Sequence, residues 1–482
     1  IIIAIALTYV ELGSMFPESG GMSRYAQYSH GPLLGFIAAW ANWISLVTLV
    51  PMEAVAAVQY MSSWPWSWAN WTKNFIKNGD ITFEGIGVVF IFMLIFTMIN
   101  FWSVKIMTHF TNLISIFKIL LPTLTIVTLI CSGFHEHNFG TNIHEFMPYG
   151  SRSIFEATSV SGIIMSYDAF QTIINMGGEL KNPRKNIVRG VLISMLITAA
   201  IYIMLQVTFI GAVEPSMLAK VGWHGIDFTS PFADLAILMG INWLVILLYL
   251  DAFVSPFGTG VAFVATASRA LAAMTHTRHL PKWLGRINQK YMIPRYAMAT
   301  DLILAVILVS LFRNWNLLAT VITASTLIAY LTGPVTVMTL RKIRPDLARP
   351  FKPRYMPWLA PIAFVLTSLA IYWSMWPTTI QVILVIALGL PIYFYYEIRY
   401  QHSDLKKQLH NCWWMIGYLI FMSFMSYIGS NGFGGQNWIK YPFDFVVIIV
   451  VSLLFYYWGV KSGRDQLDPY AEHIVQNKNK QK

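Results

Sequence analysis

The chain has 482 residues, of which 56% are hydrophobic and only 11% are charged, against roughly a quarter charged in a typical soluble domain. A soluble domain of this composition lacks the polar surface to cover its core, which excludes a soluble enzyme, and the same composition excludes a disordered or fibrous protein. A helix that crosses a bilayer needs ~20 mainly apolar residues, so the chain can supply on the order of a dozen spans. The apolar residues come in long runs without alternation, which excludes an outer-membrane barrel.

Thirteen apolar segments follow one another along the chain and predict an all-α integral membrane protein. They are residues 1–16, 33–63, 86–102, 113–134, 154–176, 190–213, 235–268, 296–312, 317–340, 357–376, 379–396, 412–430 and 443–460. The first segment opens the chain as IIIAIALTYV, with neither an initiator Met nor a basic region before it. We therefore expect the sequence to begin within a helix and not with a signal peptide.

The net charge of +11 is unevenly shared between the loops. If the segments alternate across the membrane, one set of loops carries 27 Lys and Arg and the other carries 6. Positive loops stay in the cytoplasm, so the first set and the C-terminus are expected inside, in a multi-pass protein of the cell membrane. This topology explains the charge without nucleic acid as a partner. It also places Cys131 near the outer face and Cys412 near the inner face, where the two cannot pair.

Four short stretches, in this order, resemble the amino acid–polyamine–organocation permeases. They are YVELGSMFPESGGMSRYAQYSHGP at residues 9–32, GELKNPRK at 178–185, SRALAAM at 268–274 followed by LPK at 280–282, and LRKIRPDLARPF at 340–351. The resemblance covers about residues 5–400. Each stretch alone is weakly specific, but the four lie in the family's order between apolar segments of the right number.

The resemblance implies a LeuT-like fold of two inverted five-helix repeats with broken first and sixth helices, plus additional C-terminal helices. Segment 1–16 would then be helix two and segment 154–176 helix six, while the family's first helix lies outside this sequence. We expect a permease domain over residues 1–400, with core helices two to ten and helices eleven and twelve. Residues 401–482 would add two transmembrane helices and a cytoplasmic tail. Transporters of this architecture bind substrate near the midplane, at the helix breaks.

Polar residues interrupt segment 154–176, and an intramembrane carboxylate such as Asp168 costs ~3 kcal/mol on insertion scales and marks function by default. We predict a break near residues 165–169 that lines the substrate site, because unwound backbone is tolerated in a membrane only where it lines a cavity or is buried in protein. By resemblance, Met165 to Ala169 align with the break that contacts substrate in the family. The candidate substrate-binding residues here are Met165, Ser166, Tyr167, Asp168, Ala169 and Gln171.

Asp168 departs from the family, which usually has an uncharged residue at this place. The carboxylate could pair with a cationic substrate, favouring basic amino acids or polyamines. Alternatively, it could carry a proton or bond a lysine or hydroxyl on a neighbouring helix beside a neutral substrate. The second explanation is favoured, because desolvating an ion pair costs about as much as it returns. A third reading is that Asp168 only packs helices together.

In segment 235–268, Asp251 is followed by Ser255 and Thr259 around Pro256. The two hydroxyls are four residues apart and share one helix face. In the family this helix faces the substrate and the coupling ion, so Ser255 and Thr259 are candidate substrate ligands and Asp251 a candidate coupling residue. The alternative is a packing kink whose hydroxyls bond their own backbone.

Lys118 lies in the early part of segment 113–134. By resemblance, a lysine here fills the site that sodium occupies in sodium-coupled relatives, and it could exchange protons. The alternative is that Lys118 extends to the cytoplasmic interface. Tyr330 is a candidate outer gate on helix ten, although packing is the simpler role for any one aromatic residue. The predicted coupling residues are Lys118, Asp168 and Asp251.

Other signals predict no catalytic or metal chemistry. His135, His137 and His144 fall in an outside loop without the helical H-E-x-x-H spacing, so no metal or other cofactor is predicted. His279 falls in a basic cytoplasmic loop and is expected to be solvated. The sequence contains no P-loop motif for ATP.

We therefore expect a secondary transporter, and not an enzyme, that moves an amino acid or related amine by alternating access. Coupling to protons or to exchange is expected, with the lipid bilayer and the small-molecule substrate as partners, and the oligomeric state stays open. The alternatives are a polyamine or basic amino acid exchanger and, in a different class, an ion channel, which would need a continuous water-filled pore.

Overall fold

The computed structural model describes the chain from Ile1 to Asp465, with a few interior gaps. The positions not described are Ser19, Ser103, Ser161, Asp227, Thr229 and residues 276–278, 401–404 and 466–482. The end of the predicted cytoplasmic tail therefore lies outside the described residues.

Among the described residues, eight helical stretches are long and apolar enough to cross a membrane, judged by length and composition. They are α3 (Pro32–Ser62), α4 (Phe83–Trp102), α5 (Val104–Ser132), α9 (Pro183–Ala212), α12 (Asn242–Met274), α14 (Trp315–Tyr330) with α15 (Thr332–Ile343), α17 (Thr378–Ala387) with α18 (Leu390–Tyr400), and α20 (Phe443–Lys461). The protein is thus an all-α membrane protein.

The predicted count of thirteen spans is not confirmed. Four further segments are helical but fall short of the same length or the same hydropathy: α1 (Ile2–Met15), α13 (Arg295–Leu311), α16 (Met356–Tyr372) and α19 (Leu405–Ile428). The segment predicted at 154–176 is not one helix, since α7 (Gly150–Val160) and α8 (Phe170–Asn175) occupy its two ends.

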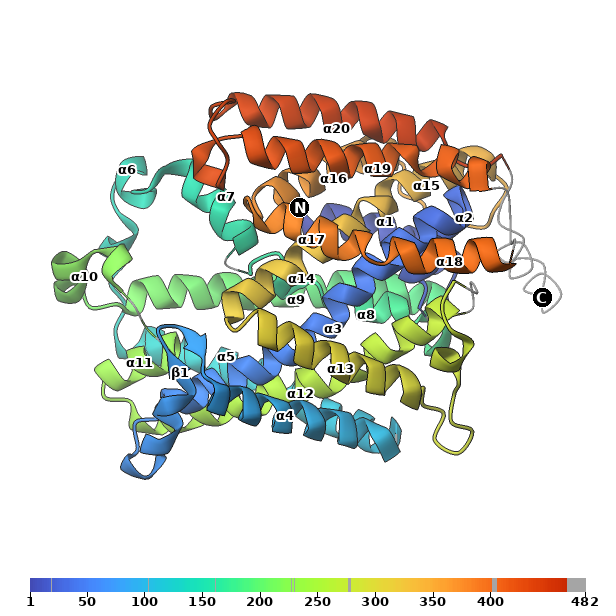
Figure 1. The fold of residues 1–482 in the computed structure, drawn as a ribbon. Helices are drawn as coiled ribbons and strands as arrows, with labels where there is room; N and C mark the ends of the chain where they lie inside the picture. Colours follow the sequence, from blue (N-terminus) through green and yellow to red (C-terminus); the bar gives the residue numbers. More distant parts are fainter. Residues whose placement is uncertain are drawn as a thin grey trace.

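Short elements connect the long helices at the two ends of the molecule. They are α2 (Met22–His30), the antiparallel strands β1 (Ile76–Lys77) and β2 (Asp80–Ile81), α6 (Ile143–Phe146), α10 (Pro215–Val221) and α11 (Pro231–Leu238). In Figure 1 the strands, α6 and α10 lie at the left end, whereas the C-terminal end of α18 lies at the right end. Loops of the two predicted sets therefore fall at opposite ends.

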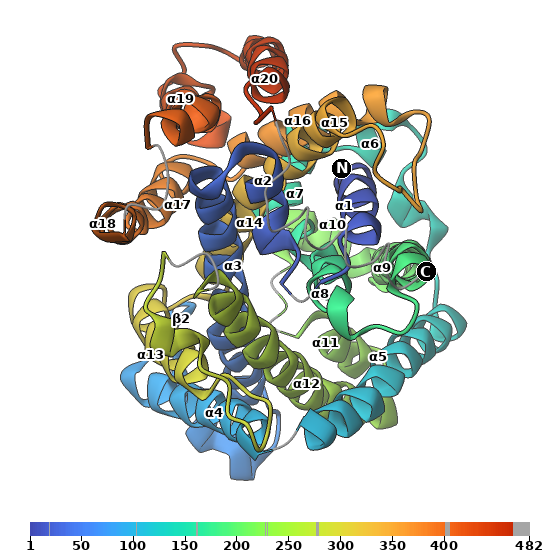
Figure 2. The same cartoon turned by 90° about the vertical axis from the view of Figure 1, so that its right-hand side faces the viewer.

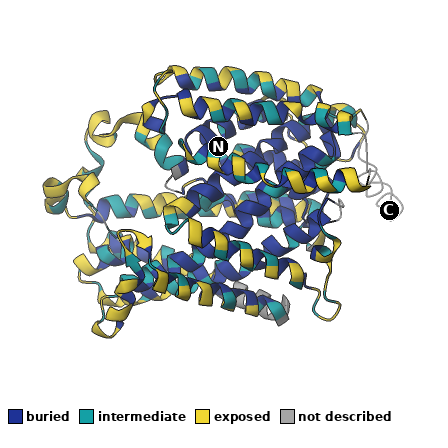
Figure 3. Cartoon of the chain, in the orientation of Figure 1, coloured by how far each residue is buried: buried dark blue, intermediate teal, exposed yellow. Residues whose placement is uncertain are grey.

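The centre of the molecule is α3, which crosses it and packs against α12, α14 and α2 (Figure 2). In the most apolar stretch of α3, and in that of α14 with α15, 94% of the residues are buried. Outer helices such as α5, α9 and α20 keep apolar residues on exposed faces (Figure 3). A long apolar helix that is buried on one side only is typical of a protein surrounded by lipid.

The four stretches that suggested the family come together in space. Gly20, in the first stretch, donates its N–H to the carbonyl of Asn175, 2.7 Å away, just before the second stretch. Its φ of +72° favours glycine, and an added Cβ would lie 2.8 Å from Cβ of Ala273 in the third stretch. Glu11, in the first stretch, binds Arg341 of the fourth. The four stretches therefore form one contact region at one end of the molecule.

Glu11 is the buried centre of an ion-pair cluster. Arg341 donates from Nε to one carboxylate oxygen at 2.8 Å and from Nη2 to the other at 2.5 Å. The Nε of Arg349 lies 3.6 Å from the same carboxylate, and its other nitrogens donate to backbone carbonyls, including that of Arg344. The Glu11 side chain has no exposed surface, and that of Arg349 is 2% exposed. The cluster connects α1 to α15 through Arg341 and to the loop after α15 through Arg349.

The prediction that His279 is solvated is wrong. Its side chain is 3% exposed, and Nε2 lies 2.7 Å from Oε2 of Glu397 on α18. Gln408 of α19 donates to the other oxygen of Glu397 at 2.5 Å, and Tyr393 donates to Gln408. The ring of Tyr393 stacks on His279 with centroids 4.2 Å apart. The loop after α12 is thus fastened to α18 and α19 by a closed polar network.

Candidate functional site

The helix predicted over residues 154–176 is broken in its middle. Gly162 has a φ of +76°, and the backbone forms only a 3-10 turn at Met165–Tyr167 before α8 starts at Phe170. The predicted break at 165–169 is confirmed, and it begins a few residues earlier, where glycine adopts the left-handed backbone. The backbone through the break is held by turn-type hydrogen bonds, such as those from the N–H of Tyr167 to the carbonyl of Ile164 and from the N–H of Asp168 to the carbonyl of Met165. In a membrane, such irregular backbone is tolerated only where it lines a cavity or is buried in protein.

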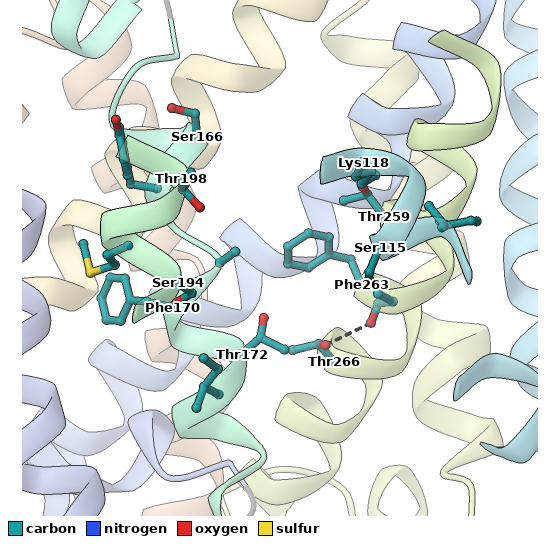
Figure 4. Close-up of a pocket in the computed structure, with 17 residues that line it drawn as sticks. Ser115, Lys118, Ser166, Phe170, Thr172, Ser194, Thr198, Thr259, Phe263 and Thr266 are labelled. Atoms are coloured by element: carbon teal, nitrogen blue, oxygen red, sulfur yellow. Dashed lines mark hydrogen bonds between the residues drawn. The ribbon is translucent and has the colours of Figure 1, made fainter. Parts of the chain in front are cut away.

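A pocket of about 400 Å³ lies beside this break, between α5, α8, α9 and α12. Figure 4 shows hydroxyl side chains from several of these elements facing the space, with Lys118 on the α5 side. The hydroxyl-bearing aliphatic residues of the lining are Ser115, Ser166, Thr172, Ser194, Thr198, Thr259 and Thr266. Lys118 is the one charged residue of this lining, so the pocket combines one cation with many hydrogen-bonding groups and apolar walls.

Lys118 belongs to a polar chain that follows one face of α12. Its Nζ donates to Oγ1 of Thr259, which in turn donates to the carbonyl oxygen of Ser255 at 3.2 Å. The Ser255 hydroxyl donates to the carboxylate of Asp251 at 2.6 Å. The carboxylates of Glu53 and Asp251 both act electrostatically on Lys118. Lys118 and the three α12 residues, which were predicted from two different segments, therefore form one connected group, and Lys118 is partly buried within it.

Asp168 lies on the other side of the break, away from this pocket. It is 2% exposed and accepts a hydrogen bond of 3.1 Å from the Tyr330 hydroxyl on α14. Thr326, one turn earlier on α14, has its hydroxyl 2.5 Å from the hydroxyl of Ser45 on α3. Among the described residues, the Asp168 carboxylate therefore has a hydroxyl partner on a neighbouring helix and is not part of the pocket lining.

The candidate residues thus divide into two groups. Those that line the pocket are Lys118, Ser166, Tyr167, Ala169 and Thr259. Those outside its lining are Met165, Asp168, Gln171, Asp251, Ser255 and Tyr330. Gln171 is fully buried, and its side-chain amide has no hydrogen-bond partner within the part of the chain that the structure describes. Substrate and coupling roles for all of these residues stay predictions.

Sequence reasoning missed the α9 wall of the pocket. Ser194 and Thr198 are four residues apart and share one face. The same spacing argument that identified Ser255 and Thr259 could have found them. It was not decisive, because hydroxyls in membrane helices commonly bond their own backbone, as Ser194 does with the carbonyl of Val191.

The described residues contain no group of three or more His, Cys, Asp or Glu side chains that could hold a metal ion. His135 instead lies 3.7 Å from the carboxylate of Glu214.

Residues 1–383 match the family model described as amino acid permease. The chain belongs to this family of amino acid permeases, within the amino acid–polyamine–organocation group. The permease is 49% identical over 463 residues to the glutamate/serine transporter AimA of Bacillus subtilis, covering 96% of this chain and 86% of the relative. It is 33% identical over 468 residues to the aspartate-proton symporter of the same organism, covering 96% and 88%. The branched-chain amino acid permease BcaP is 24% identical over 418 residues, covering 83% and 84%.

Membership of this family indicates the class of protein to which the permease belongs. It is a multi-pass membrane protein whose relatives are amino acid transporters. The pocket that adjoins the broken helix offers room and hydrogen-bonding groups for such a molecule.

Proposed function

We propose that the permease is a secondary transporter that takes up a small polar or acidic amino acid by alternating access, in symport with protons or by exchange. The relatives that are 49% and 33% identical carry glutamate, serine or aspartate by name. The proposal places the permease in the cell membrane, with the C-terminus in the cytoplasm.

One observation carries the choice of substrate: among the described residues, the lining of the pocket beside the break contains one cation, many hydroxyls and no carboxylate. A basic amino acid or a polyamine needs acidic partners, because a buried cation without one is costly. Asp168, the acid that suggested such substrates, is bonded to Tyr330 outside the pocket lining. An acidic side chain could accept hydrogen bonds from hydroxyls or interact with Lys118, and a serine side chain would bond the same hydroxyls.

The proposed working parts follow the LeuT-like layout of two inverted five-helix repeats, with permease helices up to residue 400 and two added helices beyond it. Backbone groups at the break between α7 and α8 would hold the substrate, as in other transporters with broken helices. Lys118, bonded to Thr259, would be the coupling group, with Asp251 and Glu53 as its charge partners.

The test is uptake of radiolabelled amino acids into proteoliposomes with an inward proton gradient. We expect glutamate, serine or aspartate to accumulate, and arginine and spermidine to be excluded. Equal uptake of arginine would contradict the substrate proposal. A parallel recording in planar bilayers should give no single-channel current, since a transporter has no continuous pore.

We expect Asp168→Asn to leave substrate preference unchanged while flattening the pH dependence of uptake. The amide keeps the shape of the side chain and can still accept from Tyr330, but it removes a titratable group from the break. Initial uptake rates of three amino acids across a pH series provide the measurement. Loss of one substrate together with gain of another would instead assign Asp168 to substrate binding, and an unchanged pH profile would leave it a packing role.

Cysteine labelling tests the proposed orientation. In a Cys131→Ser background, we expect Lys77→Cys to react with an impermeant thiol reagent on whole cells and Lys185→Cys to resist it. Both lysines are exposed, so the two cysteines replace no buried side chain. By the proposed topology, the two positions lie at opposite ends of the molecule. The reverse pattern would overturn the orientation. Labelling after permeabilisation serves as the control, because both positions should then react.

A further inference from the structure

A second pocket, which shares no lining residue with the pocket beside the break, lies between the loop after α12 and the end of α18. Its volume is about 400 Å³. The lining consists of two cations, three aromatic residues and two apolar residues: Lys282, Arg286, Trp283, Tyr396, Tyr400, Leu280 and Pro281. The C-terminal end of α18 lies at the right end of Figure 1, which the proposed topology assigns to the cytoplasmic face.

Within the part of the chain that the structure describes, no carboxylate neutralises the positive charge of this pocket. Neither Lys282 nor Arg286 has a carboxylate partner among the described residues, although both side chains reach the pocket. The nearest acid in sequence to the aromatic wall is Glu397, and both of its oxygens are occupied by His279 and Gln408. Two cations without acidic partners at a pocket indicate an anionic ligand.

The two walls of the pocket are connected by the buried polar network of His279, Glu397, Gln408 and Tyr393. His279 directly precedes Leu280, and Glu397 directly follows Tyr396, so each wall adjoins one partner of the buried His279–Glu397 contact. Tyr396 and Tyr400 are one turn apart on α18, with ring centroids 6.0 Å apart and rings nearly parallel. The aromatic wall and the basic wall therefore come from different segments that are fastened to each other.

We propose that this pocket binds the headgroup of an anionic phospholipid from the cytoplasmic leaflet. A phosphate diester would interact with Lys282 and Arg286, the residue types that bind phosphate. Tyr396, Tyr400 and Trp283 would pack against the glycerol and the first acyl carbons, as aromatic residues do at the membrane interface. Basic pockets between helices on the cytoplasmic side are suited to such headgroups. The proposal goes beyond transport and rests only on the proposed orientation.

Native mass spectrometry of the full, delipidated chain, titrated with phosphatidylglycerol and with phosphatidylcholine, tests the proposal. We expect phosphatidylglycerol to bind more tightly, and the double variant Lys282→Gln, Arg286→Gln to lose about 30-fold in affinity, since each cation near an anionic surface contributes about five- to sixfold and the two factors multiply. Arg286→Glu alone should also abolish the preference. The matched control is Lys290→Gln, Lys342→Gln, which removes two exposed cations that do not line the pocket, and it should bind as the wild type does.

Equal losses in the two double variants would overturn the proposal, because the effect would then be general surface attraction. Displacement of the bound lipid by inorganic phosphate or by a soluble nucleotide would also overturn it, since the ligand would then come from solution. Melting temperature in neutral lipid should be unchanged in all variants, because the substituted side chains are exposed. Substrate binding should persist in every variant, so a failed lipid result says nothing against the transport proposal.

Discussion

Replacement of Lys118 by alanine should lower concentrative uptake by about 100-fold while leaving substrate binding and exchange measurable. A positioned group that transfers a proton typically contributes a factor of this size or larger. Lys118 is connected to Thr259, and electrostatically to Glu53 and Asp251, in the middle of the bundle. Without its ammonium group, two neighbouring carboxylates lose their shared cation. Counterflow and proton-driven accumulation in the same proteoliposomes separate exchange from concentrative transport.

The matched control is Lys342→Ala, an exposed lysine at the end of α15, which should transport normally. Lys118→Arg provides a second comparison, because it keeps the charge but cannot release a proton near neutral pH. It should resemble the alanine variant in accumulation. Wild-type uptake that requires sodium and ignores a proton gradient would exclude the coupling role of Lys118.

Replacement of Glu11 by glutamine should destabilise the folded protein by about 3–5 kcal/mol, because it leaves a buried charge without its partner. Arg341 and Arg349 both face this carboxylate, and Glu11 is fully buried. The measurement is unfolding in detergent, followed by a double-mutant cycle with Arg341→Gln. A coupling energy near zero would show that the cluster does not act as a unit.

The exposed pair Arg344–Asp346 is the internal control, with Asp346 61% exposed. Hydrogen bonds from the Arg344 guanidinium hold the pKa of Asp346 below its usual range. A lowered carboxyl pKa contributes stability at neutral pH that is lost as pH falls through the folded-state value. Because the pair is exposed, Arg344→Gln should cost less than about 1 kcal/mol, and the difference from Glu11→Gln measures the effect of burial.

Patterns local to one segment allowed the sequence to predict the helical membrane class, the break in segment 154–176 and the individual polar residues. The sequence did not predict which of these residues contact one another. Asp168 and Tyr330 are 162 positions apart and bond directly, and nothing in either segment specified the other as partner. His279 was misjudged for the same reason, since its partner Glu397 is 118 positions away. A histidine in a basic loop is solvated by default until a distant helix covers it.

The pocket lining was predicted in part, because its residues come from four segments. The break and Lys118 were recognisable as polar interruptions of apolar runs. The α9 hydroxyls were not, because Ser and Thr are inexpensive in a membrane helix and carry little positional signal. Conversely, the sequence identified Ser255 and Asp251 as candidates, but both lie outside the pocket lining and are connected to it through Thr259.

The meeting of the first stretch with the other three has an evolutionary consequence. Gly20 leaves no room for a larger side chain beside Ala273, and Glu11 is matched by Arg341 and Arg349. Substitutions at these places should therefore be inherited jointly across related genomes, with an acid lost at position 11 accompanied by loss of a base at 341 or 349. If position 11 varied independently of positions 341 and 349, distant members of the family would hold this end of the molecule together by other contacts.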